Sequence, residues 1–158
     1  MPTRDPQMTL RMTQVSVDHW NRTMDMTGSI VVGRKLFDAM NGWGGRHPTG
    51  KPVVVLTHQA PAEEWEHFTF VTEDIERAIA VASELAGGKG VGLNGGTIAS
   101  QALDAGLLDE VWVDLVPVLL GGGVRFFDQL GGAPFPLEGP VEVTQGTGVT
   151  HIRYRVAR

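Results

Sequence analysis

Two short glycine turns carry the residues best able to hold an anionic ligand. In the first, the apolar run Ile30-Val31-Val32 predicts a buried strand that leads into Gly33, Arg34 and Lys35, where a helix begins. Free N–H groups at the start of a helix favour an anion, and two cationic side chains add to that preference. A glycine turn with two solvated basic residues explains the segment equally well, so the segment alone leaves both interpretations open.

The second glycine turn follows another predicted strand and reads Leu93-Asn94-Gly95-Gly96-Thr97-Ile98. Because neither glycine carries a Cβ, a pyrophosphate or a ring can lie against the backbone there. A plain strand-to-helix connection explains the same residues. Residues 90–95 also match G-x-G-x-x-G, but the first two glycines precede and interrupt the strand. In a Rossmann dehydrogenase these glycines follow the strand, so their position here disfavours that class of enzyme.

The charge distribution favours a small polyanion as the ligand. The chain has 13 Lys and Arg against 18 Asp and Glu, a formal net charge of −5, which disfavours nucleic acid as a partner. Residues 33–58 nevertheless hold four cationic side chains and one acidic side chain, Asp38. A local basic patch on an acidic protein suits a small ligand with several negative charges.

One acidic residue interrupts the longest apolar strand pattern, Val111 to Leu120. By alternation Asp114 shares a strand face with Trp112. A buried carboxylate needs either a hydrogen-bonding partner or a role with a shifted pKa. Asp114 is therefore the candidate catalytic residue, although pairing with a nearby donor explains it slightly better. The chain has no cysteine, and its five histidines include no pair four residues apart, so no metal site is predicted.

The elements that must position these residues alternate along a chain of 158 residues, which is one domain's worth. Residues 1–12 show no periodicity. Helices are predicted over 16–26, 34–40, 73–86 and 97–105, and strands over 30–32, 53–57, 68–71, 91–93, 111–120, 141–146 and 149–156. Thr72 is the expected cap of the third helix, and the last two strands form a hairpin. This order predicts an α/β sandwich around one mixed sheet with an antiparallel end.

No apolar run approaches the ~18 residues of a membrane span, and the N-terminus has no apolar signal region. A cytoplasmic protein is therefore expected.

Several ordered motifs resemble the dihydrofolate reductase-like superfamily, and in particular the C-terminal reductase domain of the riboflavin-biosynthesis enzyme and its stand-alone relatives. They are VVGRKLFD (31–38), GRHPTGKPVVVLTH (45–58), LNGGTIASQAL (93–103), LLDEVWVDLVPVLLGGGVRFFD (107–128) and GTGVTHIRYRV (146–156). The resemblance implies a single domain over residues 1–158, with a three-layer α/β/α fold and a mixed central sheet that ends in the C-terminal hairpin.

The resemblance also implies NADPH as hydride donor. Gly33, Arg34 and Lys35 would hold the cofactor phosphates, while Thr57 and His58 would lie beside the adenosine ribose and its 2′-phosphate. The pyrophosphate and the nicotinamide side would be cradled by Asn94, Gly95, Gly96, Thr97 and Ile98. The implied activity is reduction of a small pyrimidine- or pteridine-like heterocycle, such as 5-amino-6-(5-phosphoribosylamino)uracil or dihydrofolate, by a homodimer. A non-catalytic nucleotide-binding protein of the same fold is the alternative.

Two features depart from the family pattern. Leu36 stands where relatives often have Thr, which removes a hydroxyl from the phosphate site.

The family also opens with a central strand carrying a Ser-Leu-Asp-Gly-like motif, which residues 15–20 match only weakly. Residues 16–26 are interpreted as the following helix, and the first strand as absent. Unpaired strand edges are then expected at 91–94 and 111–120. Three explanations follow, in order of preference: a lost start of the chain, oligomerisation, and insertion of residues 8–13.

Overall fold

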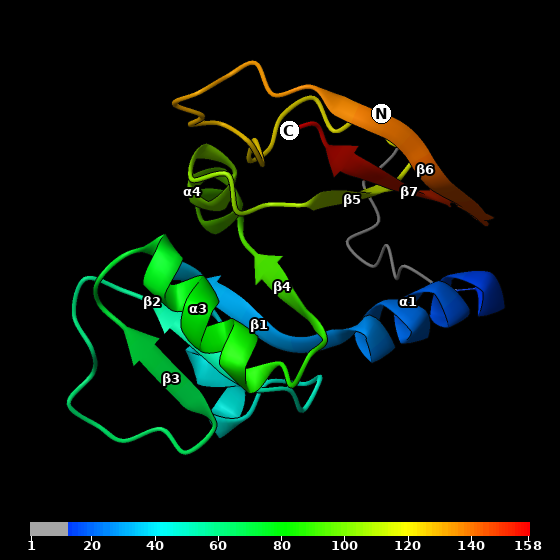
Figure 1. Ribbon diagram of the computed structural model, residues 1–158. Helices are drawn as coiled ribbons and strands as arrows, with labels where there is room; N and C mark the ends of the chain where they lie inside the picture. The colour runs from blue at the N-terminus through cyan, green and yellow to red at the C-terminus, as the bar shows by residue number, and fades with distance from the viewer. Residues whose placement is uncertain (1–12) are drawn as a thin grey trace.

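The computed structural model describes residues 13–158, so the irregular structure expected for residues 1–12 lies outside the described part (Figure 1). Within this part of the chain, five helices and seven strands follow one another: α1 (Gln14–Met26), β1 (Thr27–Gly33), α2 (Arg34–Ala39), the 3₁₀ segment η1 (Asn41–Gly45), β2 (Val53–Leu56), β3 (Phe68–Val71), α3 (Ile75–Leu85), β4 (Gly90–Asn94), α4 (Gly96–Asp104), β5 (Glu110–Leu115), β6 (Leu137–Gly146) and β7 (Val149–Val156). Among these residues no helix is both long enough and apolar enough to cross a bilayer.

The first four strands form a parallel sheet with the order β3-β2-β1-β4. Both faces of this sheet are covered, which explains why its strands read as continuous apolar runs rather than alternating ones. Val31 and Val54 are in register and point to one face, against α3 and α4. Val32 and Val55 point to the other face, where Phe37 of α2 packs beside them. This half of the molecule therefore has the three layers that the resemblance implies.

The last three strands form a separate antiparallel sheet with the order β5-β7-β6. The predicted hairpin is confirmed, because β6 and β7 pair from Gly146 and Val149 outward. Gly148 lies in the intervening turn with a φ of 73°, a conformation that glycine adopts without steric cost.

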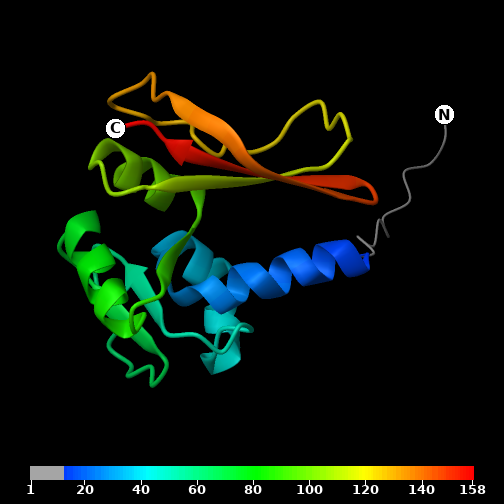
Figure 2. The same cartoon turned by 45° about the vertical axis from the view of Figure 1, so that its right-hand side comes forward.

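The expected single sheet is divided in two. Strand β4 is the edge of the parallel sheet and β5 is the edge of the antiparallel sheet, and the two do not pair. In both views the antiparallel sheet lies above the parallel one, and α1 extends from β1 beneath it (Figures 1 and 2). The physical reason is that no strand among residues 13–158 lies between β4 and β5. Within the described residues, the two edges expected from the sequence are thus unpaired.

Several element boundaries differ from the predictions, and three of the differences have a clear physical cause. Strand β5 ends at Leu115 rather than at residue 120, because Pro117 cannot donate a ladder hydrogen bond. The cap of α3 is Asp74 and not Thr72, since the Asp74 carboxylate accepts a hydrogen bond from the N–H of Arg77 at 2.8 Å. Gly28 lies inside β1 instead of ending α1. A Cβ there would collide with the backbone of Ala86, so this glycine lets α3 pack closely on the sheet.

Candidate functional site

The carboxyl ends of three neighbouring parallel strands form the candidate cofactor site. In the register of the sheet, Gly33 of β1 lies opposite Leu56 of β2, and Val32 lies opposite Asn94 of β4. The residues that follow each strand therefore emerge at the same edge, the usual place for ligands in parallel α/β sheets. All ten residues that the resemblance assigns to the cofactor lie at these strand ends or directly after them in the chain, while their individual roles stay predictions.

Two helices begin at this edge with their backbone N–H groups uncapped by side chains. Gly33 precedes α2 and Gly95 precedes α4, and neither helix start has a side-chain cap. Gly95 has a φ of 110°, and a Cβ added there would have open space around it. Free N–H groups next to open space are what an anionic ligand requires. The residues present therefore fit a phosphate-bearing cofactor.

Gly96 has a different structural role from Gly95. A Cβ at Gly96 would run into the carbonyl oxygen of Phe126, so the loop between β5 and β6 packs directly on this turn. A Val at either glycine would fill the space expected for the pyrophosphate, and it would also disturb the local structure. Gly95→Val would strain the backbone, and Gly96→Val would displace the Phe126 loop.

Arg34 ties two parts of the edge together. Its Nε donates to Asp38 Oδ1 at 2.7 Å, and one terminal nitrogen donates to the carbonyl oxygen of Gln59 at 3.0 Å. The Thr57 hydroxyl donates to the same carbonyl at 3.0 Å. These bonds place the Arg34 guanidinium beside the segment that contains His58, whose side chain is exposed. Arg34 and the neighbouring Lys35 thus form a cationic cluster at the edge, and Asp38 offsets part of its charge.

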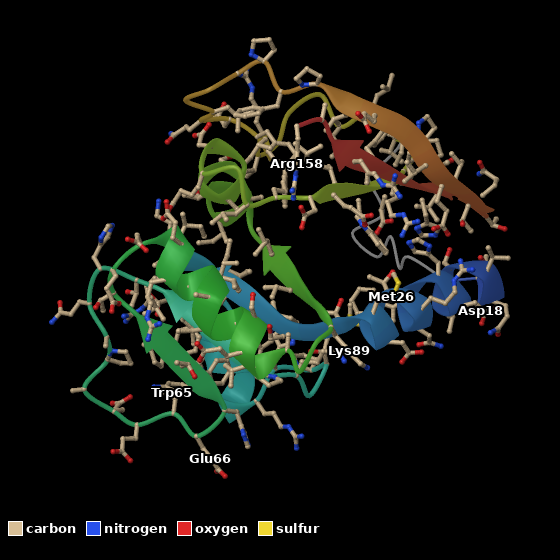
Figure 3. All side chains as sticks on the ribbon, in the orientation of Figure 1. Asp18, Met26, Trp65, Glu66, Lys89 and Arg158 are labelled. Atoms are coloured by element: carbon tan, nitrogen blue, oxygen red, sulfur yellow. The ribbon has the colours of Figure 1, made fainter. Side chains whose placement is uncertain are left out.

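A large cavity of about 930 Å³ lies between the two sheets. Strand β4 lines it with its whole length from Gly90 to Asn94, and β5 with its first three residues, Glu110 to Trp112. Figure 3 shows Met26 and Lys89, which also line it, where α1 ends and β4 begins. The lining also includes aromatic and polar side chains, namely Trp20, Thr23, Phe126, Phe127 and Arg153. Asn94 is the one predicted cofactor residue that reaches this cavity.

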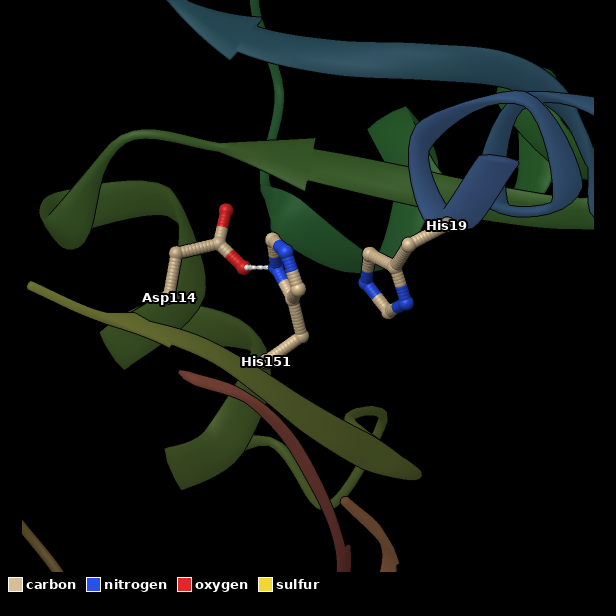
Figure 4. Close-up of side chains that lie close together, drawn as sticks. All are labelled: His19, Asp114 and His151. Atoms are coloured by element: carbon tan, nitrogen blue, oxygen red, sulfur yellow. Dashed lines mark hydrogen bonds and ion pairs between the residues drawn. The ribbon is translucent and has the colours of Figure 1, made fainter. Parts of the chain in front are cut away.

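A hydrogen-bonded relay connects three elements at the far end of β5 (Figure 4). His151 Nδ1 lies 2.7 Å from Asp114 Oδ1, and His151 Nε2 lies 2.9 Å from the Ser16 hydroxyl. An ionised carboxylate only accepts, so Nδ1 carries a proton; in the neutral ring Nε2 then accepts from Ser16. Ser16 and His151 are buried, whereas 67% of the Asp114 side chain is exposed. The relay satisfies polar groups that burial would otherwise leave unpaired.

His19 stacks on this relay, with its ring centroid 4.2 Å from that of His151 and the planes 18° apart. Burial lowers the pKa of His19, and the neighbouring His151 lowers it further. Donor atoms of His19, Asp114 and His151 lie within 4.8 Å of one another, a spacing that could hold a metal ion. However, a ring nitrogen binds a metal in the plane of its ring, and the two stacked rings face each other with their flat sides. The geometry suits a relay better than a metal centre.

Sequence reasoning did not find the relay, because its members are far apart in the chain. Asp114 and His151 meet only through the register of β5 on β7, and Ser16 reaches them only through the docking of α1. Asp114 was expected to be buried if catalytic, and it is exposed. Asp114 pairs with His151, as expected if its role is to bind a nearby donor and not to catalyse a reaction. It does not line the cavity. A catalytic role for Asp114 stays a prediction.

Comparisons with known proteins agree with this architecture. The sequence profile of the RibD C-terminal domain family matches residues 9–139. Among solved structures, a putative riboflavin biosynthesis protein from Shewanella sp. PV-4 superposes with a TM-score of 0.70 at 24% identity, covering 88% of this chain and 79% of that one. No curated protein gives a significant match.

Two further structures have the same fold. The diaminohydroxyphosphoribosylaminopyrimidine deaminase/5-amino-6-(5-phosphoribosylamino)uracil reductase of Thermotoga maritima has a TM-score of 0.61 at 16% identity. The match covers 92% of this chain and half of that enzyme. Dihydrofolate reductase from Enterococcus faecalis, solved with NADP(H) and RAB-propyl, has a TM-score of 0.56 at 17% identity over 90% of this chain and 83% of that one.

Proposed function

The chain belongs to the RibD C-terminal domain family, and from that premise we propose that it is an NADPH-dependent reductase of a small pyrimidine- or pteridine-like heterocycle. The fold is that of reductases, and the proposal adds the cofactor and the class of substrate. The observation that carries it is the convergence of three strand ends, two uncapped helix starts and a cationic cluster at one sheet edge.

Each part of that edge has a task in the proposed complex. The N–H groups that follow Gly33 and Gly95 bind phosphate oxygens, and Arg34 and His58 meet the 2′-phosphate that distinguishes NADPH from NADH. Bound NADPH supplies a hydride. The chain aligns the donor with the acceptor and excludes water, which are the contributions a protein makes to cofactor chemistry. Asn94 connects the cofactor edge to the cavity, where the aromatic side chains offer stacking surfaces for a flat heterocycle.

The division of the sheet supports one alternative, a nucleotide-binding protein without catalysis. The cavity between β4 and β5 is wide, and a substrate held there loosely would not be aligned for hydride transfer. Both functions require the same cofactor edge and differ only in turnover.

Two measurements test the proposal in sequence. Nicotinamide fluorescence during titration with NADPH and NADH should show saturable binding that favours NADPH. Absorbance at the nicotinamide band should then fall when dihydrofolate or a phosphoribosylaminopyrimidine is added. Absence of binding for both cofactors would overturn the whole proposal. Normal NADPH binding without oxidation by either class of substrate would favour the non-catalytic alternative.

A further inference from the structure

We propose that α1 is a pH-sensitive latch on the antiparallel sheet, held at neutral pH by the contacts of Ser16 and His19 with His151 and released in mild acid. The proposal does not depend on the proposed reductase activity. It concerns how one wall of the cavity is held in place, because α1 contributes Trp20 and Met24 to the lining. Release of the helix opens the cavity on that side.

Helix α1 docks on the antiparallel sheet through its first turn. Of the helix residues, all of which the structure describes, only Ser16 is buried. Its hydroxyl lies 2.9 Å from Nε2 of His151 on β7. Gly146 of β6 lies directly against the same hydroxyl, since a Cβ there would come within 2.7 Å of the oxygen. The absence of a side chain at Gly146 therefore permits the close approach on which this hydrogen bond depends.

The other contacts of α1 with the sheet are weaker. The large apolar side chains Val15, Trp20 and Met26 are exposed, so their burial contributes little to docking. Arg22 and Glu142 form an ion pair at 3.6 Å, but both side chains reach solvent, and a surface pair of this kind adds little. The position of the helix therefore depends mainly on the relay and on the histidine stacked against it.

His19 adds a titratable group to this contact (Figure 4). Its ring stacks on that of His151, with centroids 4.2 Å apart and planes 18° apart. Burial against the sheet lowers the pKa of His19, and His151 lowers it further. The His19 ring is therefore neutral when α1 is docked at neutral pH, and a proton on this ring opposes docking.

Charged groups from all the packed elements act on His19. Two carboxylates, Asp114 and Glu142, favour its protonated form, but they do not outweigh burial and His151. The groups that face the ring are Arg22 on α1, Asp114 on β5, Glu142 on β6 and His151 on β7. Beside them, the Arg153 guanidinium lies over the Trp112 ring and near the carboxylates of Glu110 and Glu142.

Acid therefore weakens the docking of α1. In the released helix His19 lies in water and has its ordinary pKa of 6.5, whereas its pKa in the docked helix is lower. The docked form thus binds this proton less readily. Docking has its full strength above pH 6.5, and it weakens as the pH falls from 6.5 toward the docked-state pKa. Uptake of one proton shifts the docking equilibrium by at most about tenfold per pH unit.

Hydrogen exchange on the full-length protein tests the latch. A free helix of 13 residues is marginal in water, so release of α1 exposes its amides to exchange. Protection factors for residues 18–26 should be constant from pH 8 to pH 6.5 and fall by up to about tenfold by pH 5.5, while those of β1 and β2 stay high. Constant protection in α1, or an equal loss in β1 and β2, would overturn the proposal.

Two matched substitutions separate His19 from the other histidines. His19→Phe keeps an aromatic ring against His151 but cannot bind a proton, so α1 should keep its protection at pH 5.5. His67→Phe, at an exposed position before β3, is the control and should leave the pH dependence of α1 unchanged. The same pH dependence in both variants would overturn the proposal.

A cross-link distinguishes release of the helix from a change within it. The chain has no cysteine, so Arg22→Cys combined with Glu142→Cys creates a unique pair for a short bis-maleimide. The two replaced side chains are in contact across the docking surface. Linked protein should keep the protection of α1 at pH 5.5, whereas the unlinked double variant should lose it. Equal loss with and without the link would show that acid acts within the helix, and it would overturn the latch.

Discussion

At the scale of single residues, Arg34 tests whether the basic edge discriminates NADPH from NADH. Arg34→Ala should weaken NADPH binding by about 1.5–3 kcal/mol, the usual contribution of a charged hydrogen bond, and should weaken NADH binding less. The structure adds that Asp38 already accepts from this guanidinium at 2.7 Å, which favours the lower end of that range.

Binding titrations with both cofactors measure the difference. Arg77→Ala on α3 is the control, since it removes the same charge from an exposed position on another element. Equal losses for NADPH and NADH in the Arg34→Ala protein would contradict a role at the 2′-phosphate.

Ser16 tests the relay. Removing its hydroxyl leaves the buried Nε2 of His151 without the partner it has at 2.9 Å. Ser16→Ala should therefore lower the free energy of unfolding by ~1–3 kcal/mol, the cost of an unsatisfied buried polar group. Ser83→Ala, which removes an exposed hydroxyl on α3, should change it by less than about 0.5 kcal/mol. Denaturant unfolding compares the two proteins; similar values would show that water or a rearranged side chain replaces the serine.

At the scale of elements, Asp104 anchors the loop between β5 and β6 to the end of α4. Its two carboxylate oxygens accept from the N–H groups of Gly131 and Gly132 at 2.9 and 3.0 Å. These two bonds lower the pKa of Asp104. The pKa of such a carboxyl is lower in the folded protein than in the unfolded chain. Its contribution to stability is therefore fully present at pH values above the unfolded-state pKa. That contribution is lost as the pH falls through the folded-state pKa.

Asp104→Asn removes the charge at every pH. At neutral pH the amides of Gly131 and Gly132 should therefore exchange faster in this variant than in the unmodified protein, and the difference should shrink under strongly acidic conditions. Exchange followed by mass spectrometry measures it. Asp128→Asn in the same loop is the control, because no backbone N–H bonds to that side chain in the described structure. Unchanged exchange in Asp104→Asn would show that the loop is held by other contacts.

The elements also show where sequence reasoning succeeds and where it cannot. Apolar runs such as Val53–Leu56 predict their strands because burial on both faces leaves little choice of residue. The end of β5 and the cap of α3 differ from the predictions because each depends on one competing local feature, Pro117 and the Asp74 carboxylate. The convergence of Gly33 and Gly95 follows from parallel topology, so the cofactor edge is predictable. The relay and the Phe126 contact with Gly96 depend on docking between distant segments, for which the sequence carries no local signal.

At the scale of the whole molecule, the antiparallel sheet exposes an apolar face that supports the proposed homodimer. Val113 and Val143 both lie opposite Ile152 and share this face, and Val143 is 55% exposed. Light scattering should give the mass of two chains for the unmodified protein, because contiguous apolar surface favours association. Val143→Lys should shift it toward one chain, whereas Val118→Lys, outside the sheet, should not. A single-chain mass before substitution would contradict the dimer.

Two histidines make the stability of the whole domain depend on pH. Burial lowers the pKa of both His19 and His47 below the ordinary value of 6.5, and His151 lowers that of His19 further. In the unfolded chain both rings bind protons more readily, so protonation favours unfolding. The stability associated with these neutral rings is fully present above pH 6.5, and it declines as the pH falls from 6.5 toward the folded pKa values.

The urea concentration at the midpoint of unfolding, measured from pH 8 to pH 5, should therefore fall on acidification. Combining His19→Gln with His47→Asn should flatten the slope, while His67→Gln at an exposed position should leave it steep. A double variant with the slope of the unmodified protein would show that other groups control the acid sensitivity of the fold.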